Sequence, residues 1–306
     1  MIPICLVTGF LGSGKSTLLR HIIERHPGER IVYLVNEFSP LDLDGALLER
    51  EDEDVVAIPG GSIFCQCLVT QFVGHLKSIP ERFHSPEEPV RGVVVEASGI
   101  ANPMVVEQML AETGLDEVYD LASVVSIVDP GSLPKLVHTL PNIRAQVEAA
   151  DIVLVNKTDL FEPEEVDAAE GIVREISAQA RVIRTVRCRV DLDIFASAHV
   201  RTLSGEYASG PDPNFARFSV AFEEPVDIER LRQELEGLER EIYRAKGFVP
   251  TGDEVLYVDM SPAELTVESA DGDEPWQGLV VVARGDDHAG TEQLVRRIES
   301  GDLSAG

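Results

Sequence analysis

The sequence predicts an α/β protein, in which a mainly parallel sheet flanked by helices is followed by a smaller α+β domain. Over the first two-thirds of the chain, short Val- and Ile-rich runs alternate with longer amphipathic stretches. A glycine-rich loop joins the first apolar run to a helical pattern, and a stretch rich in Gly, Ser and Pro precedes the last part of the chain. At 306 residues the chain is long enough for about two domains, each with its own core.

The strands expected in the first domain are apolar runs without polar alternation, as in strands that are buried on both faces of a sheet. They are Ile4–Val7, Ile31–Val35, Val93–Glu96, Ser123–Val128, Ile152–Val155 and a weaker run near Val182. The helices expected between them are Ser16–Arg25, Val69–Ser78, Pro103–Leu110, Ile143–Ala149 and Pro163–Ser177. This alternation is typical of βαβ units around a parallel sheet.

A change of pattern predicts the second domain. We expect a first domain over residues 1–200, a linker over 201–214 with Ser-Gly and Asp-Pro pairs, and a C-terminal domain over 215–306. The C-terminal pattern combines period-two and helical spacing. Its expected elements are a strand with Phe218, Val220 and Phe222, a helix with Ile228, Leu231, Leu235 and Leu238, strands Val255–Val258, Leu265–Val267 and Leu279–Val282, and a helix Thr291–Ser300.

Composition excludes several classes of partner and location. A formal net charge of −28 argues against nucleic-acid and anionic-membrane partners, because both require a basic surface. No apolar run reaches the ~18–20 residues that span a bilayer, and the N-terminal stretch lacks the basic segment of a signal peptide. Four cysteines are too few for a disulfide framework, so we expect a cytoplasmic protein. The acidic surface fits adaptation to high salt and simple solubility equally well.

Gly9 to Ser16 form a complete G-x-x-x-x-G-K-S/T phosphate-binding pattern directly after the first apolar run. The backbone N–H groups of such a loop and the N-terminus of the following helix form a cradle for phosphates. Lys15 is expected to reach the β- and γ-phosphates, and the Ser16 hydroxyl is expected to bind Mg²⁺. The residues assigned to the phosphates are Gly9, Gly12, Ser13, Gly14, Lys15, Ser16 and Thr17.

The run Asn156-Lys157-Thr158-Asp159 follows an expected strand and matches the N-K-x-D pattern of guanine recognition. The Asp159 carboxylate can accept hydrogen bonds from guanine N1–H and the exocyclic amine, with Asn156 beside it and the Lys157 stem against the ring. Adenine has no donor at N1 and would leave the carboxylate desolvated and unpaired. The expected ligand is therefore GTP.

The strand Val93–Glu96 ends in an acid that is followed by Ala97-Ser98-Gly99. We assign Glu96 to the Mg²⁺ ion and the attacking water, which makes Lys15 and Glu96 the expected catalytic pair, and we assign the Gly99 N–H to the γ-phosphate. A capped strand end with a turn glycine is the alternative. The segment from Asn36-Glu37-Phe38 to Asp44 occupies the place of a first switch loop, although its acids could simply be solvated.

Taken together, these motifs resemble those of the CobW-like P-loop GTPases, a family of metallochaperones. The resemblance runs nearly end to end. Besides the phosphate and base motifs, it rests on Asn36-Glu37-Phe38, Asp44-Gly45, Glu96 to Pro103, Val128-Asp129, Gln146, Ala150-Asp151, and Ile242-Tyr243-Arg244-Ala245-Lys246-Gly247. It implies slow GTP hydrolysis to GDP and phosphate, coupled to delivery of a Zn²⁺- or Co²⁺-type ion or to maturation of a metalloprotein client.

The resemblance also implies a transition-metal site built from a Gly-Cys-hydrophobic-Cys-Cys motif, and this chain departs from it. The corresponding stretch is Gly61-Ser62-Ile63-Phe64-Cys65-Gln66-Cys67, in which Ser62 and Phe64 replace the first two cysteines. Cys65 and Cys67 are the candidates, with Glu37, or alternatively a histidine such as His75, as a further ligand. The two cysteines could instead pack at the head of a helix, form a redox pair, or leave an inert site.

Three functions are therefore open at the level of sequence. The leading one is a GTPase that delivers metal to a client protein. A nucleotide-gated protein-interaction switch with a degenerate metal site is the first alternative, and a P-loop small-molecule kinase is the second. No arginine finger is identifiable, so a partner protein or a second subunit could supply the transition-state charge. The oligomeric state stays open, with a homodimer among the states considered.

Overall fold

In the computed structural model, contacts divide the chain into two compact units, Met1–Pro211 and Asp212–Gly306. The structure describes residues 1–37, 55–59, 69–85, 88–196, 202–205, 215–252, 254–260, 265–270, 277–284 and 288–304. Of the predicted linker, only residues 202–205 fall within these ranges, so its boundaries stay a prediction. None of the helices in the described ranges is long and apolar enough to cross a bilayer.

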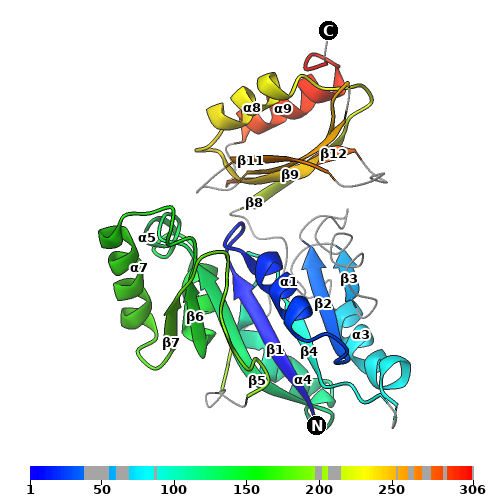
Figure 1. The fold of residues 1–306 in the computed structure, drawn as a ribbon, viewed down its shortest axis with the longest axis vertical. Coiled ribbons are helices and arrows are strands. Elements are labelled where there is room, and N and C mark those ends of the chain that lie inside the picture. Colours follow the sequence, from blue (N-terminus) through cyan, green and yellow to red (C-terminus); the bar gives the residue numbers. More distant parts are fainter. Residues whose placement is uncertain are drawn as a thin grey trace. The chain divides into compact units, whose positions relative to one another are not determined.

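The first unit is built on a parallel sheet (Figure 1). Its described strands are β1 (Ile2–Gly9), β2 (Ile31–Glu37), β3 (Val55–Pro59), β4 (Gly92–Glu96), β5 (Tyr119–Val128), β6 (Ile152–Val155) and β7 (Arg181–Arg184). Among the described residues they form one seven-stranded sheet in the order β3-β2-β4-β1-β5-β6-β7. All pairings are parallel, so the carboxyl ends of the strands meet at one edge.

Helices follow the strands and cover both faces of this sheet (Figure 1). They are α1 (Lys15–Arg25), α3 (Val69–Phe83), α4 (Val106–Glu112), α5 (Leu133–Leu136), α6 (Pro141–Ala149) and α7 (Pro163–Ile176), with 3₁₀ turns at Pro103–Val105 and Leu115–Glu117. Leu18, Leu19 and Ile22 of α1 pack on one face of the sheet. Phe72 and Leu76 of α3 belong to the cluster on the other face. Strands covered on both sides explain the unbroken apolar runs of the sequence.

The second unit is an antiparallel sheet with two helices. Its strands are β8 (Phe215–Ala221), β9 (Ile242–Pro250), β10 (Val255–Met260), β11 (Leu265–Ser269) and β12 (Gly278–Arg284), in the order β11-β10-β9-β12-β8. The helices are α8 (Ile228–Gly237) and α9 (Ala289–Glu299), which lie together on one side of this sheet (Figure 1). Leu231 and Leu235 of α8 and Leu294 of α9 share a buried cluster with the sheet.

The predicted fold class is confirmed, and each expected strand and helix has a counterpart. Two strands were not predicted. The first is β3, and the second is β9, the middle strand of the second sheet. The β9 sequence hides its strand character because Arg244 and Lys246 interrupt the apolar pattern. Arg244 forms a two-pronged ion pair with Asp259 of β10, at 2.9 and 3.2 Å, which compensates its charge within the sheet.

Gly247 of β9 is required by the close approach of β12. A Cβ atom at this position would lie 1.9 Å from the Gly278 carbonyl oxygen, which belongs to the backbone and cannot move aside. We expect Gly247→Ala to lower the free energy of unfolding of the second unit by about 3 kcal/mol, measured by urea denaturation. Gly237→Ala is the matched control, because nothing lies within 4 Å of a Cβ there. Equal effects of the two variants would contradict this packing.

Candidate nucleotide-binding site

The glycine-rich loop links β1 to α1 at the carboxyl edge of the parallel sheet. Its backbone enters the left-handed region at Gly9, Gly12 and Gly14, with φ angles of 142°, 75° and 117°. A Cβ at Gly9 would lie 2.3 Å from the Ile127 carbonyl oxygen, so this glycine is also needed for close packing against β5. The sequence therefore places glycine where the turn demands it, and the N–H groups at the start of α1 are left to bind an anion.

Lys15 folds back over this loop. Its ammonium donates to the carbonyl oxygens of Gly9, at 3.0 Å, and Phe10, at 3.3 Å, and the side chain is only 5% exposed. The Ser13 hydroxyl is fully buried and has no hydrogen-bond partner among the described residues. Ser16 and Thr17 are half-buried at the start of α1. A cation and an unsatisfied hydroxyl in one loop are suited to phosphate oxygens.

Glu96 ends β4 beside this loop. It is 3% exposed and lies in register with Val7 of β1, two residues before Gly9. The Ser16 hydroxyl and the Glu96 carboxylate supply the kind of oxygen ligands that Mg²⁺ prefers, so these residues fit the ion that the motif implies. The structure thus brings the sequence-predicted Ser16 and Glu96 to the same end of neighbouring strands.

The segment after Glu96 packs directly on the phosphate loop. A Cβ at Gly99 would lie 2.6 Å from the Leu11 backbone nitrogen. Two α6 side chains, absent from the predicted site, hold this segment: Gln146 donates to the Gly99 carbonyl at 3.1 Å, and Asn142 donates to the Ile100 carbonyl at 2.9 Å. Any movement of Gly99 therefore has to break contacts with α6 as well as with the loop.

Asn156 lies at the end of β6 and joins three segments. Its amide donates to the Ser13 carbonyl at 2.9 Å, and its oxygen accepts from the Cys188 N–H at 2.8 Å and the Thr185 hydroxyl at 3.1 Å. The side chain is 2% exposed. It therefore ties the phosphate loop to the segment that follows β7.

The rest of the base motif faces outward. Lys157 adopts a left-handed φ of 60° and is half-buried, whereas the Asp159 side chain is exposed. The exposed carboxylate is accessible to an incoming base. Asn156 and Asp159 thus differ in role, since the first is engaged by the protein and the second faces solvent.

Thr185 to Cys188 were not predicted as part of the site. The Thr185 carbonyl accepts from the Thr158 N–H at 3.3 Å, and the Cys188 thiol donates to the Gly14 carbonyl at 3.4 Å. Arg187 and Cys188 have left-handed φ angles of 51° and 53°, which are uncommon outside glycine. The available signal was their place after a strand next to β6, because the carboxyl ends of parallel strands share an edge.

The predicted transition-metal ligands belong mostly to residues outside the described ranges. Cys65 and Cys67 lie outside the described residues, as does Asp44 of the expected switch loop, and for Glu37 only the backbone at the end of β2 is described. Within the described ranges, no three His, Cys, Asp or Glu side chains form a group that could hold a metal ion.

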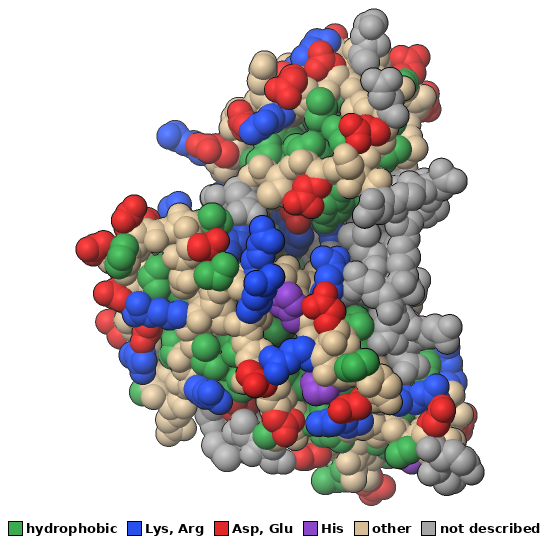
Figure 2. Space-filling view, in the orientation of Figure 1, with side chains coloured by type: hydrophobic (Ala, Val, Ile, Leu, Met, Phe, Trp, Pro, Cys, Tyr) green, Lys and Arg blue, Asp and Glu red, His purple; other side chains and the backbone are tan. Residues whose placement is uncertain are grey.

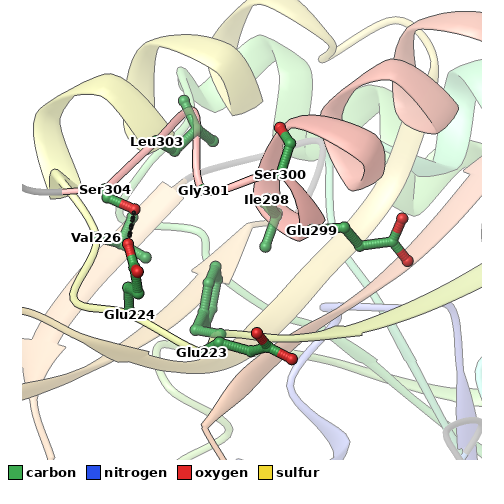
Figure 3. Close-up of a pocket in the computed structure, with 10 residues that line it drawn as sticks. Glu223, Glu224, Val226, Ile298, Glu299, Ser300, Gly301, Leu303 and Ser304 are labelled. Carbon is green, nitrogen blue, oxygen red and sulfur yellow. Dashed lines mark hydrogen bonds between the residues drawn. The ribbon is translucent and has the colours of Figure 1, made fainter.

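A polar pocket lies in the second unit, between the turn after β8 and the end of α9 (Figure 3). Glu223, Glu224 and Glu299 line it, and Glu224 accepts a hydrogen bond from Ser304 at 3.0 Å. All its lining residues belong to the second unit, so none of the nucleotide motifs contributes to it.

Fold and site together define a P-loop nucleotide-binding protein. Residues 3–184 match the family described as "CobW/HypB/UreG, nucleotide-binding domain", and residues 215–299 match the "Cobalamin synthesis protein cobW C-terminal domain". The chain therefore belongs to the CobW/HypB/UreG family, as the sequence motifs predicted.

The chain is similar to several named proteins. "Zinc chaperone YjiA" of Escherichia coli is 26% identical to this chain, in an alignment that covers 90% of each protein. "Zinc-regulated GTPase metalloprotein activator 1" of Schizosaccharomyces pombe is 29% identical over 68% of this chain, which spans only 52% of that relative's length. A crystal structure of Zn(II)-bound YjiA GTPase from E. coli covers 99% of both chains at 22% identity, with a TM-score of 0.48.

The contacts of Asn156 predict the reactivity of a buried thiol. Burial raises the pKa of Cys188 to about 12, so the thiol stays protonated at pH 8 and alkylation should be slow. We expect Asn156→Ala to release the Cys188 N–H and to raise the rate of Cys188 alkylation at least about tenfold. This factor corresponds to the free energy of about one lost hydrogen bond. The measurement is iodoacetamide labelling with peptide mass spectrometry, in a background with Cys65 and Cys67 replaced by serine.

Cys5 is the internal control for this experiment. It is also buried, and burial likewise raises its pKa to about 12, but it belongs to β1 and takes no part in the hydrogen bonds of Asn156. Its labelling should not change. A parallel rise at both cysteines would indicate global unfolding, and an unchanged Cys188 would mean that Asn156 does not hold this segment.

Proposed function

We propose that this chain binds GTP, hydrolyses it to GDP and phosphate, and uses the cycle to deliver a Zn²⁺- or Co²⁺-type ion to a client metalloprotein. The observation that carries the nucleotide part is the direct bond from Asn156 to the Ser13 carbonyl, at 2.9 Å. It joins the phosphate loop to the segment that bears Asp159. The metal part is supported by the family and by relatives named as zinc chaperones and a zinc-regulated metalloprotein activator.

The residues of the loop divide the work of binding the triphosphate. Backbone N–H groups from Gly9 to Thr17 bind the phosphate oxygens, and the Lys15 ammonium turns from the loop carbonyls to the β- and γ-phosphates. Ser16 and Glu96 would hold Mg²⁺, which neutralises charge on these phosphates. Glu96 also orients the attacking water, and the Gly99 N–H contacts the γ-phosphate.

Loss of the γ-phosphate changes what the Glu96–Gly99 segment contacts. Gly99 packs on Leu11 and its carbonyl accepts a hydrogen bond from Gln146 of α6. A movement of Gly99 after loss of the γ-phosphate would therefore also change the contacts of α6. Cys65 and Cys67, with Glu37, are the proposed transition-metal ligands.

One observation favours a second function. Ser62 and Phe64 stand where the family motif has cysteines, so the remaining C-x-C pair supplies only two thiolates. In this alternative the chain is a GTP-gated switch that binds and releases a protein client without carrying metal. A homodimer, or a client that supplies an arginine, would complete either mechanism.

Replacing the Asp159 carboxylate with an amide tests whether this residue selects guanine. We expect Asp159→Asn to reduce the preference for GTP over xanthosine triphosphate by about 10- to 100-fold, because the amide can donate to the xanthine oxygen that replaces the guanine amine. The measurement is competition of both triphosphates against a fluorescent GDP. Asp120→Asn is the matched control, since Asp120 is also exposed but lies at the amino end of β5. Unchanged selectivity in Asp159→Asn would refute the assignment.

Metal binding separates the two proposed functions. We expect reduced wild-type protein to bind Zn²⁺ or Co²⁺ at least about tenfold more tightly than a Cys65→Ser/Cys67→Ser variant. Loss of a contact in the outer shell of a metal site lowers metal affinity about 10- to 100-fold, and loss of a ligand should lower it at least as much. The titration is made with and without GTP, and GTP binding by the double variant serves as the control for folding. Equal metal affinity in the two proteins would favour the metal-free switch.

A further inference from the structure

Two side chains of α1 reach across to the segment that follows Cys188. His21 Nε2 lies 2.9 Å from the Arg187 carbonyl oxygen. One turn later, Arg25 donates to the Val190 carbonyl at 2.8 Å and pairs with the Asp191 carboxylate at 2.6 Å. A carbonyl can only accept, so His21 Nε2 carries a hydrogen and donates it to Arg187, while Nδ1 lies 3.3 Å from the Glu24 carboxylate. In Figure 2, Lys or Arg side chains and His side chains lie, with acidic ones among them, on the face of the first unit where Figure 1 places α1.

These contacts are made to a backbone segment with an uncommon conformation. Arg187 and Cys188 are consecutive residues in the left-handed region of backbone conformation, where residues other than glycine are uncommon. His21 fixes the Arg187 carbonyl from one side. From the other side, the Asn156 oxygen accepts from the Cys188 N–H at 2.8 Å. The segment is therefore fixed between α1 and the base motif.

The same segment borders the phosphate loop. A Cβ at Gly14 would lie 2.6 Å from the Asn156 amide nitrogen and 2.9 Å from the Cys188 sulfur, so the loop, Asn156 and Cys188 are packed together. The helix that begins at Lys15, at the end of the phosphate loop, carries His21 and Arg25 further along its length. One helix thus begins at the phosphate loop and contacts residues 187–191.

We propose that His21 and Arg25 are positioning residues for the nucleotide. They hold residues 187–191 in the shape that closes the base side of the site, and they connect this side through α1 to the phosphate loop. The inference rests on the proposed guanine-nucleotide function and deepens it. Its consequence is kinetic: when either contact is lost, the base side opens more often and the nucleotide leaves faster.

The test uses substitutions that separate the hydrogen bond from the bulk of the side chain. A glutamine amide can place a donor near the position of His21 Nε2, whereas leucine cannot. We expect His21→Leu to raise the dissociation rate of a fluorescent GDP about tenfold, His21→Gln to keep it within about twofold of wild type, and Arg25→Met to act like His21→Leu. Dissociation is followed by stopped-flow chase with unlabelled GDP.

His26→Leu is the matched control. His26 caps the end of the same helix and contacts Glu29, not the 187–191 segment, so its replacement should leave the dissociation rate unchanged. Thermal melting of all variants without nucleotide reports stability separately. The proposal is overturned if His21→Gln is as impaired as His21→Leu, or if His21→Leu and Arg25→Met change stability but not dissociation.

Competition of GTP and of ATP with the fluorescent GDP, measured on the wild-type protein, separates failure of the positioning role from failure of the proposed function. If the wild type shows no preference for guanine, the assigned function is wrong. The positioning role is then still decided by the dissociation rate of the nucleotide that binds. If guanine is preferred and His21→Leu dissociates like wild type, only the positioning role is wrong.

Discussion

The geometry of the site depends on one buried amide, that of Asn156. Its three hydrogen bonds connect the phosphate loop at Ser13, the turn after β7 at Thr185, and the backbone of Cys188. Because the side chain is buried, each partner left without it would be an unsatisfied polar group out of reach of water. Each segment is thus fixed relative to the other two before any ligand arrives, which lowers the ordering cost of binding.

Such a hub is possible only because the sheet is parallel. Parallel pairing brings the ends of β1, β4, β6 and β7 to one edge, where their following loops are neighbours in space though distant in sequence. Gly9 and Gly14 then allow the backbone to approach Ile127 and Asn156 more closely than a Cβ would permit. The burial of β1 and β4 on both faces holds these ends in place.

The sequence predicted those parts of the molecule whose signals are local. Buried parallel strands have unbroken apolar runs, and the phosphate loop has a spacing set by its own backbone, so both were found. The strand β9 was not, because Arg244 is compensated by Asp259 on another strand, a contact that no local pattern reveals. The Thr185–Cys188 segment was missed for the same reason, since its backbone is held by Asn156 and His21 from far along the chain.

Charge explains why the binding site has to be so closely built. A chain with a formal net charge of −28 repels a triphosphate at long range, yet screening limits this repulsion to a Debye length of about 8 Å at physiological salt. Within that distance the groups proposed to bind the phosphates are the N–H array at the start of α1 and the Lys15 ammonium. N–H dipoles are effective only when they converge on one point, and their convergence depends on the φ angles of Gly12 and Gly14. Because the overall charge does not attract the phosphates, binding depends on the geometry of the loop. Asn156 helps to fix this geometry through its hydrogen bond to the Ser13 carbonyl.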